Sequence, residues 1–197
     1  MADRGTVRQL NVSAGGVPKR AVPVATVTRL GLEGDRHRDH QHHGGPERAV
    51  CLFSWETIQD LAAEGHAITP KAIGENVTIQ GLDWSLVVPG AHLLLGRHVL
   101  LYVTRYASPC ATIAPVFLGH EFSRVSQKRH PGCSRVYARV LCEGDLRSGD
   151  PVRLVSAHET DRLVNAQPGA HASARAAGCQ FKYLARASDS VLGSVVG

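Results

Sequence analysis

The chain has 197 residues, of which 43% are hydrophobic and 20% are charged, and its formal net charge is +5. This length fits one domain or two small ones, and the balance of apolar and charged residues excludes global disorder. No apolar run approaches the roughly 18 residues that span a bilayer, and the first residues lack the apolar core of a signal peptide. We therefore expect a cytoplasmic protein without a membrane segment.

The cysteines and the aromatic residues exclude further classes. Five cysteines lie at positions 51, 110, 133, 142 and 179, and no two of them form a CxxC pair. This spacing argues against a disulfide framework and against a common structural zinc site. Aromatic residues make up 5% of the chain, which is low for a surface that stacks on bases, so nucleic-acid binding is not expected.

Short β-strand patterns dominate the chain. Residues 6–13 and 22–28 are expected to form an opening strand pair around a turn with Gly15, Gly16 and Pro18. Ser54 is placed to cap a helix over residues 55–64. The other strand patterns are 48–54, 76–80, 92–95, 98–105, 135–142 and 151–155, with a tight hairpin at Gly96-Arg97 and a turn-rich link over 143–150. The pattern predicts a mainly β protein, an antiparallel barrel or sandwich with one or two short helices.

The last 41 residues differ in composition from the rest of the chain. Residues 157–197 are rich in Ala, Ser, Arg and Gly and show little periodicity. We expect a β domain over residues 1–156, followed by a C-terminal extension that is partly helical or disordered.

A polar loop over residues 34–48 concentrates basic side chains and glycines. Its candidates for binding an anionic group are Arg36, His37, His43, Gly44, Gly45 and Arg48. The two glycines allow backbone N–H groups to approach a ligand closely. Two alternatives stay open: a metal site made of neighbouring histidines at positions 37, 40, 42 and 43, and a solvated loop without function.

Cys110 is the candidate nucleophile or metal ligand. It follows Pro109 after the strand pattern 98–105, a position that presents a thiolate at the end of a strand. The alternative is a small buried hydrophobic residue. Cys51 and Cys142 lie inside strand patterns and are interpreted as core residues.

One strand face carries two cations and a phenol. On the strand 135–142, residues Arg135, Tyr137 and Arg139 share one face, while the opposite face is apolar and belongs to the core. An arginine on the polar face, Arg139 above all, can clamp a phosphate with two parallel hydrogen bonds. A solvated outer sheet face is the alternative.

Four ordered segments resemble a MOSC domain, the family named after the C-terminal domain of molybdenum cofactor sulfurase. The similarity covers about residues 20–155 and is closest to small stand-alone bacterial members. Its segments are GLEGD (31–35) with HGGPERAV (43–50), IGENVTIQGL (73–82), Pro109-Cys110, and YARVL (137–141) with Gly144 and Gly149-Asp150.

This resemblance implies a barrel-like domain that binds the molybdenum cofactor, a pyranopterin with a phosphate tail. It implies that Cys110 ligates molybdenum and that N-hydroxylated compounds such as amidoximes and purines are reduced. Arg139 and the basic loop would hold the phosphate and the pterin edge. Asn76 and Glu75 would contact the pterin amides or close the turn, and His37 or His43 would deliver a proton. No flavin or iron–sulfur motif is present in the sequence, so a separate reductase is expected.

Two alternative functions stay open. Cys110 can instead carry sulfur as a persulfide, or the chain can be a non-catalytic module that binds and delivers the cofactor. The sequence leaves the substrate, the redox partner and the oligomeric state open.

Overall fold

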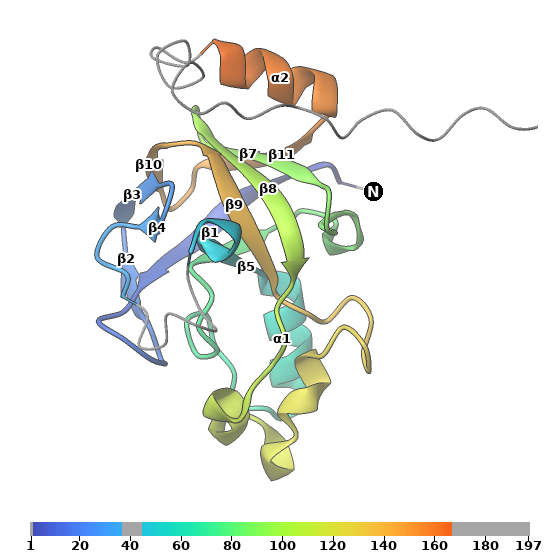
Figure 1. Cartoon of the computed structure of the whole chain (residues 1–197). Helices are drawn as coiled ribbons and strands as arrows, with labels where there is room; N and C mark the ends of the chain where they lie inside the picture. The colour runs from blue at the N-terminus through green and yellow to red at the C-terminus, as the bar shows by residue number, and fades with distance from the viewer. Residues whose placement is uncertain (1, 37–44, 167–197) are drawn as a thin grey trace, which may run out of the picture.

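Seven strands close into a barrel in the computed structural model, which describes residues 2–36 and 45–166 (Figure 1). Their order around the barrel is β11-β7-β8-β9-β5-β6-β1, and pairing of β11 with β1 closes the ring. The strands are β1 (Arg4–Val12), β5 (Val50–Ser54), β6 (Val77–Gln80), β7 (His92–Leu95), β8 (Val99–Tyr106), β9 (Val136–Cys142) and β11 (Pro151–Val155). Only β5 and β6 pair in parallel among these neighbours. The mainly β barrel predicted from the sequence is confirmed.

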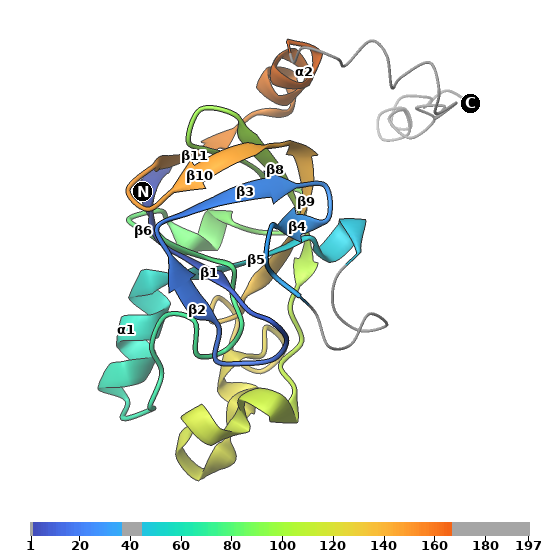
Figure 2. The ribbon, with the colours of Figure 1, turned by 90° about the vertical axis from the view of Figure 1, so that its left-hand side faces the viewer.

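A three-stranded sheet covers one side of the barrel. Figure 2 shows its strands facing the viewer, in the order β10-β3-β4. They are β3 (Val24–Thr28), β4 (Gly31–Leu32) and β10 (Gly144–Arg147), while β2 (Arg20–Val22) pairs with the end of β1.

Two expectations about these strands were wrong. The single strand predicted over 22–28 is two strands in different sheets, because Pro23 lies between them and cannot donate a ladder hydrogen bond. The link over 143–150, expected as turns, contains β10, in which Leu146 is fully buried between exposed neighbours. Because only one side chain of this strand is buried and turn-forming residues surround it, the sequence shows no alternating pattern that would predict a strand.

Two α-helices lie at opposite ends of the barrel (Figure 1). The predicted first helix is confirmed as α1 (Trp55–Ala63), where the Ser54 hydroxyl accepts a hydrogen bond from the Thr57 amide at 3.1 Å. Helix α1 is part of the crossover that the parallel β5–β6 pair requires. Helix α2 (Ala157–Asn165) packs Leu163 and Val164 against the outside of the barrel. Neither α-helix of the described residues has the length and apolar character that crossing a membrane requires.

A second core fixes the segment that follows Cys110. Short 3₁₀ helices succeed one another there: η3 (Ala111–Val116), η4 (Leu118–His120) and η5 (Phe122–Val125), while η1 (Pro46–Arg48) and η2 (Trp84–Leu86) lie elsewhere. Ile113 and Phe117 pack with Ile58 of α1 in this core, separate from the barrel interior. Each such burial stabilises the fold by about 1.5–3 kcal/mol, so the chain around Cys110 is held in place.

Candidate functional site

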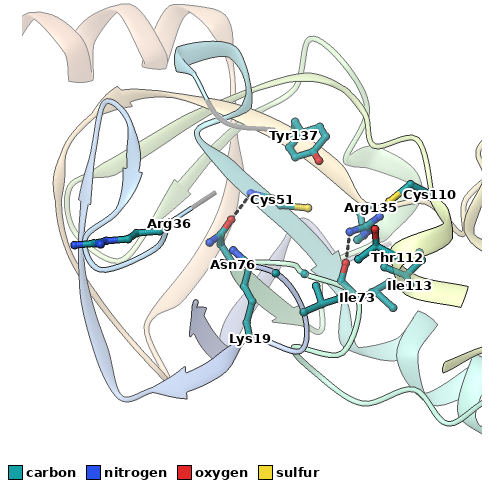
Figure 3. Close-up of a pocket in the computed structure, with 13 residues that line it drawn as sticks. Lys19, Arg36, Cys51, Ile73, Asn76, Cys110, Thr112, Ile113, Arg135 and Tyr137 are labelled. Atoms are coloured by element: carbon teal, nitrogen blue, oxygen red, sulfur yellow. Dashed lines mark hydrogen bonds between the residues drawn. The ribbon is translucent and has the colours of Figure 1, made fainter. Parts of the chain in front are cut away.

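A cavity of about 300 Å³ lies between β5, β9, the segments 13–19 and 71–76, and the start of η3 (Figure 3). This volume is at the lower end of the range for small-molecule sites. Figure 3 shows Cys110 and Arg135 at one end and Lys19 toward the other, where the exposed Arg36 borders the cavity with its guanidinium directed away from the other labelled residues. The two ends offer different chemistry.

The thiol end is built around Cys110. This residue directly precedes η3, is half-buried, and lines the cavity together with Thr112. The chain that leads to it is tied to β9, since the Ala107 amide donates to the Arg135 carbonyl at 2.8 Å. The thiol therefore comes from a fixed backbone.

Arg135 contributes a buried guanidinium to the lining of the same cavity as this thiol. Its side chain is part of a residue that is only 7% exposed, and Nη1 donates a hydrogen bond to the carbonyl of Ile73. The Nε group is buried and has no hydrogen-bond partner among the described residues. A guanidinium carries five N–H donors, so Arg135 keeps donors for an acceptor in the cavity.

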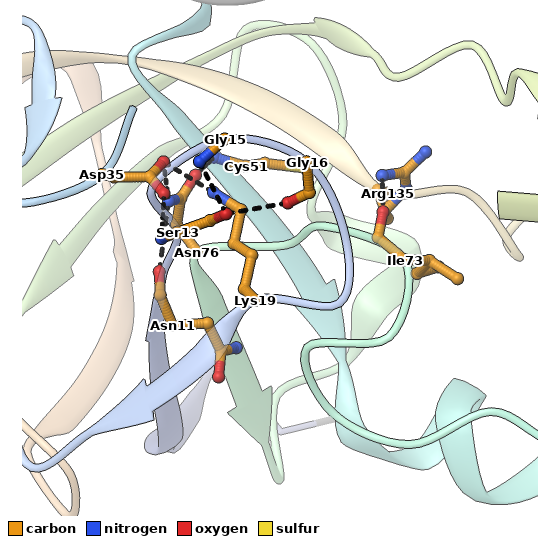
Figure 4. A network of polar contacts seen from close by, with 10 residues as sticks. All are labelled: Asn11, Ser13, Gly15, Gly16, Lys19, Asp35, Cys51, Ile73, Asn76 and Arg135. Carbon is orange, nitrogen blue, oxygen red and sulfur yellow. Dashed lines mark hydrogen bonds and ion pairs between the residues drawn. The ribbon is translucent and has the colours of Figure 1, made fainter. Parts of the chain in front are cut away.

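The basic end is held by a buried polar network (Figure 4). The Lys19 ammonium lies 2.6 Å from Oδ2 of Asp35, and Nδ2 of Asn76 donates to the same oxygen at 2.7 Å. Oδ1 of Asp35 accepts from the Ser13 amide at 2.8 Å. Asn76 also accepts from the Cys51 amide at 3.0 Å, which links the network to β5. These contacts fix the positions of the side chains before any ligand binds.

Cys51 and Tyr137 lie opposite each other in the β5–β9 pair, and both line the cavity between its ends. Burial raises the pKa of the Cys51 thiol, although the charges of Arg135 and Lys19 act in the opposite direction. Burial also raises the pKa of Tyr137 to about 12. Both groups are therefore protonated at neutral pH and can donate hydrogen bonds.

Glu75 belongs to the segment 71–76 and holds it together through hydrogen bonds of its side chain. It is fully buried, and Oε1 accepts hydrogen bonds from the Lys71 amide and, at 3.3 Å, from the Thr78 hydroxyl. Burial raises the pKa of Glu75. It does not line the cavity, so its contacts match the turn-closing alternative.

Three of the residues predicted from the sequence meet in this cavity: Arg36, Asn76 and Cys110. Arg139 does not line it; its Nη1 lies 3.0 Å from Oε1 of Glu47, and its guanidinium covers the ring of Tyr102 at 5.1 Å.

The rest of the predicted basic loop lies elsewhere. Gly45 directly precedes η1 and Arg48 is its last residue, and neither lines the cavity. Gly45 has a positive φ of 78°, which glycine tolerates. His37, His43 and Gly44 lie outside the described residues, as do the other histidines of the alternative metal site. Within residues 2–36 and 45–166, no three His, Cys, Asp or Glu side chains gather to hold a metal.

The sequence analysis did not predict that Lys19 and Cys51 line the cavity. Cys51 is buried, as its strand pattern predicted, but it also faces the cavity. Arg135 and Tyr137 carried a signal, because they share a strand face with Arg139. Lys19 follows a turn with no periodic pattern and left no signal.

Comparisons with known proteins agree with this architecture. The model of the MOSC domain family matches residues 39–153, which is more than half of the chain. An uncharacterized protein of Bacillus subtilis, YflK, is 31% identical over 73% of this chain and 65% of its own length. The Escherichia coli protein YiiM is 29% identical over 66% of this chain and 58% of its own. The chain thus matches less than two thirds of the length of either relative.

A solved structure shows the same fold. The crystal structure of YiiM from Geobacillus stearothermophilus superimposes with a TM-score of 0.60 and 25% identity, over 77% of this chain and 75% of that one. With the family model, the ordered motifs and the barrel in agreement, the chain belongs to the MOSC domain family.

Proposed function

We propose that the chain binds the molybdenum cofactor in this cavity and reduces N-hydroxylated compounds. One observation carries the proposal: a single cavity joins the thiol of Cys110 to a basic end with Lys19 and Arg36. A soft thiolate suits molybdenum, and cations suit a phosphate. The donor set of the cavity therefore fits an elongated ligand with a metal at one end and an anion at the other.

Each residue then has a role. The Cys110 thiolate would ligate the metal, while Lys19 and Arg36 would hold the phosphate tail. The remaining N–H donors of Arg135, beside Cys110, would bind acceptor atoms near the metal. When bound, the cofactor supplies two-electron oxygen-atom chemistry, and the protein positions it.

The reaction needs an external electron source. Cleavage of the N–O bond of a hydroxylamine takes two electrons and two protons and releases water and the amine. The chain itself has no flavin or iron–sulfur motif. A separate reductase is therefore part of the proposal.

Elemental analysis tests the metal site. The parent, Cys110→Ser and the control Cys133→Ser would be purified from a host that makes the cofactor, and their molybdenum content measured. We expect near-stoichiometric metal in the parent and the control and a large loss in Cys110→Ser. The same samples would be assayed with an N-hydroxylated adenine and reduced methyl viologen. Absence of molybdenum from the parent would overturn the proposal.

Sulfur carriage is the second candidate. It is favoured by the donors of Arg135 near Cys110, because a persulfide anion on that thiol would be stabilised by a cation. Mass spectrometry of the purified chain distinguishes the two: an added sulfur atom on Cys110 without molybdenum supports the carrier.

A further inference from the structure

Two adjoining grooves lie beside the segment that leads to Cys110. One, of about 650 Å³, is bounded by residues 106–109 and 120–129. The other, of about 370 Å³, is bounded by η2 and by residues 131–134. Both are lined by Tyr106 and Gln127, so the two grooves adjoin at these residues, and together they are named here the Tyr106 surface. It is distinct from the cavity, whose lining includes Cys110 itself.

The larger groove is basic. His120, Lys128 and Arg129 line it, against one carboxylate, Glu121. Lys128 and Arg129 are exposed, and within the described part of the chain neither lies within 4.0 Å of a carboxylate oxygen. Arg124, by contrast, is paired with Glu64 at 2.5 Å. The positive charge of the groove is therefore available to a partner.

The smaller groove is more apolar. Val88 and Trp84 line it, and Val88 is 38% exposed. The neighbouring Leu86 is also among the few large hydrophobic side chains that the described residues expose. An apolar patch beside a charged rim is the composition of a protein interface, whereas a metabolite site is more enclosed.

We infer that the Tyr106 surface docks an acidic electron-transfer protein, which reduces the site at Cys110. The inference rests on the proposed function, since that function needs an external donor. Pro109 lines the larger groove and is bonded to Cys110, which lines the cavity. Consecutive Cα atoms are about 3.8 Å apart, so a donor docked in the groove comes close to the ligand of the proposed metal.

The electron balance fixes what the donor does. Two one-electron donors dock in succession, each is oxidised by one electron, and two protons come from water. The N–O bond of the substrate breaks, and its oxygen leaves as water. Weak electron-transfer complexes use small interfaces, and opposite charges raise their association rate.

A charge-reversal pair tests the docking surface. The variant K128E/R129E changes the net charge by four units, and so does the control R97E/R147E. Arg97 precedes β8 whereas Tyr106 ends it, and the seven residue steps of this strand put the control site roughly 23 Å from Tyr106. Arg147 is near Arg97, because its neighbour Leu146 approaches Gly96.

A reduced flavodoxin, an acidic flavin protein, serves as the probe, and reduced methyl viologen serves as a donor that needs no docking. We expect kcat/KM for flavodoxin to fall about 10–100-fold in K128E/R129E and less than 3-fold in the control. The parent rate should decrease with added salt. Methyl viologen turnover should be unchanged in both variants.

Binding provides a second readout that is independent of turnover. Titration calorimetry with oxidised flavodoxin should show at least 10-fold weaker binding to K128E/R129E than to the parent and the control. Equal losses in both variants, no loss in either, or a dimer of this chain that buries the surface would each overturn the docking inference. Failure of the proposed function is recognised separately, because the parent would then be inactive with methyl viologen.

Discussion

The carboxylate of Asp35 lies 2.6 Å from the ammonium of Lys19, and both side chains are almost completely buried. The same carboxylate oxygen accepts the amide of Asn76, 41 residues away in sequence. This one ion pair therefore ties together the three chain segments that wall the basic end of the cavity.

Replacing Lys19 by Met should destabilise the protein strongly. The change leaves the buried Asp35 carboxylate without its ammonium partner, and breaking a buried pair in this way costs roughly 3–5 kcal/mol. Urea unfolding measures the loss. Arg20→Met, at the exposed neighbouring position, should stay within about 0.5 kcal/mol of the parent. A loss below about 1 kcal/mol for Lys19→Met would show that the pair is solvated in solution.

Arg135 and Arg139 should respond oppositely to the same substitution. Arg135→Met removes the buried cation beside Cys110, so we expect a large loss of bound molybdenum. Arg139→Met removes a partly exposed pair with Glu47 and a contact with the ring of Tyr102, each worth no more than about 1 kcal/mol, and should keep the metal. Metal content per folded protein, with circular dichroism as the check of folding, measures both. Equal metal loss in the two variants would contradict the position of the site.

The strand face of Arg135, Tyr137 and Arg139 shows what a sequence can and cannot predict. Alternation identifies the three side chains as sharing a face. It does not say which of them meets a cavity, because strands twist and the two ends of one strand face different surroundings. Here Arg135 and Tyr137 line the cavity, while Arg139 reaches η1.

The barrel itself was predictable from short alternating strands, and the family motifs led to Cys110. The parallel β5–β6 pair and the burial of Lys19 were not, because pairing partners and tertiary ion pairs leave no periodic pattern in a single sequence. Pro23 is visible in the sequence, but the β-branched residues on both sides of it continue the pattern of a single strand.

The two thiols of the cavity should differ in reactivity. Burial raises the pKa of Cys51, so it is mostly the unreactive thiol at pH 7.5, whereas Cys110 is half-buried. With iodoacetamide, we expect Cys110 to be alkylated several-fold faster than Cys51, as measured by peptide mass spectrometry. Labelling of Cys51 should increase as the pH is raised toward 10. Equal rates at pH 7.5 would mean that the cavity activates Cys51 as well.

Glu75→Gln should make the fold less sensitive to pH. The pKa of Glu75 is raised by burial, so the unfolded chain ionises first, near its usual value of about 4.3. The stability contributed by protonated Glu75 is complete below that pH and is lost as the pH rises through the folded-state pKa. Gln keeps an oxygen for the Lys71 amide and does not ionise.

Urea unfolding at pH 4.0, 5.5 and 7.5 measures this effect. We expect the free energy of unfolding of Glu75→Gln, relative to that of the parent, to increase with each step in pH, so that the variant becomes relatively more stable. Glu121→Gln, at an exposed position, reports the effect of losing one negative charge elsewhere. A relative stability that instead falls with pH would mean that the Glu75 carboxylate is ionised in the fold and stabilised by the nearby positive charge of Arg135.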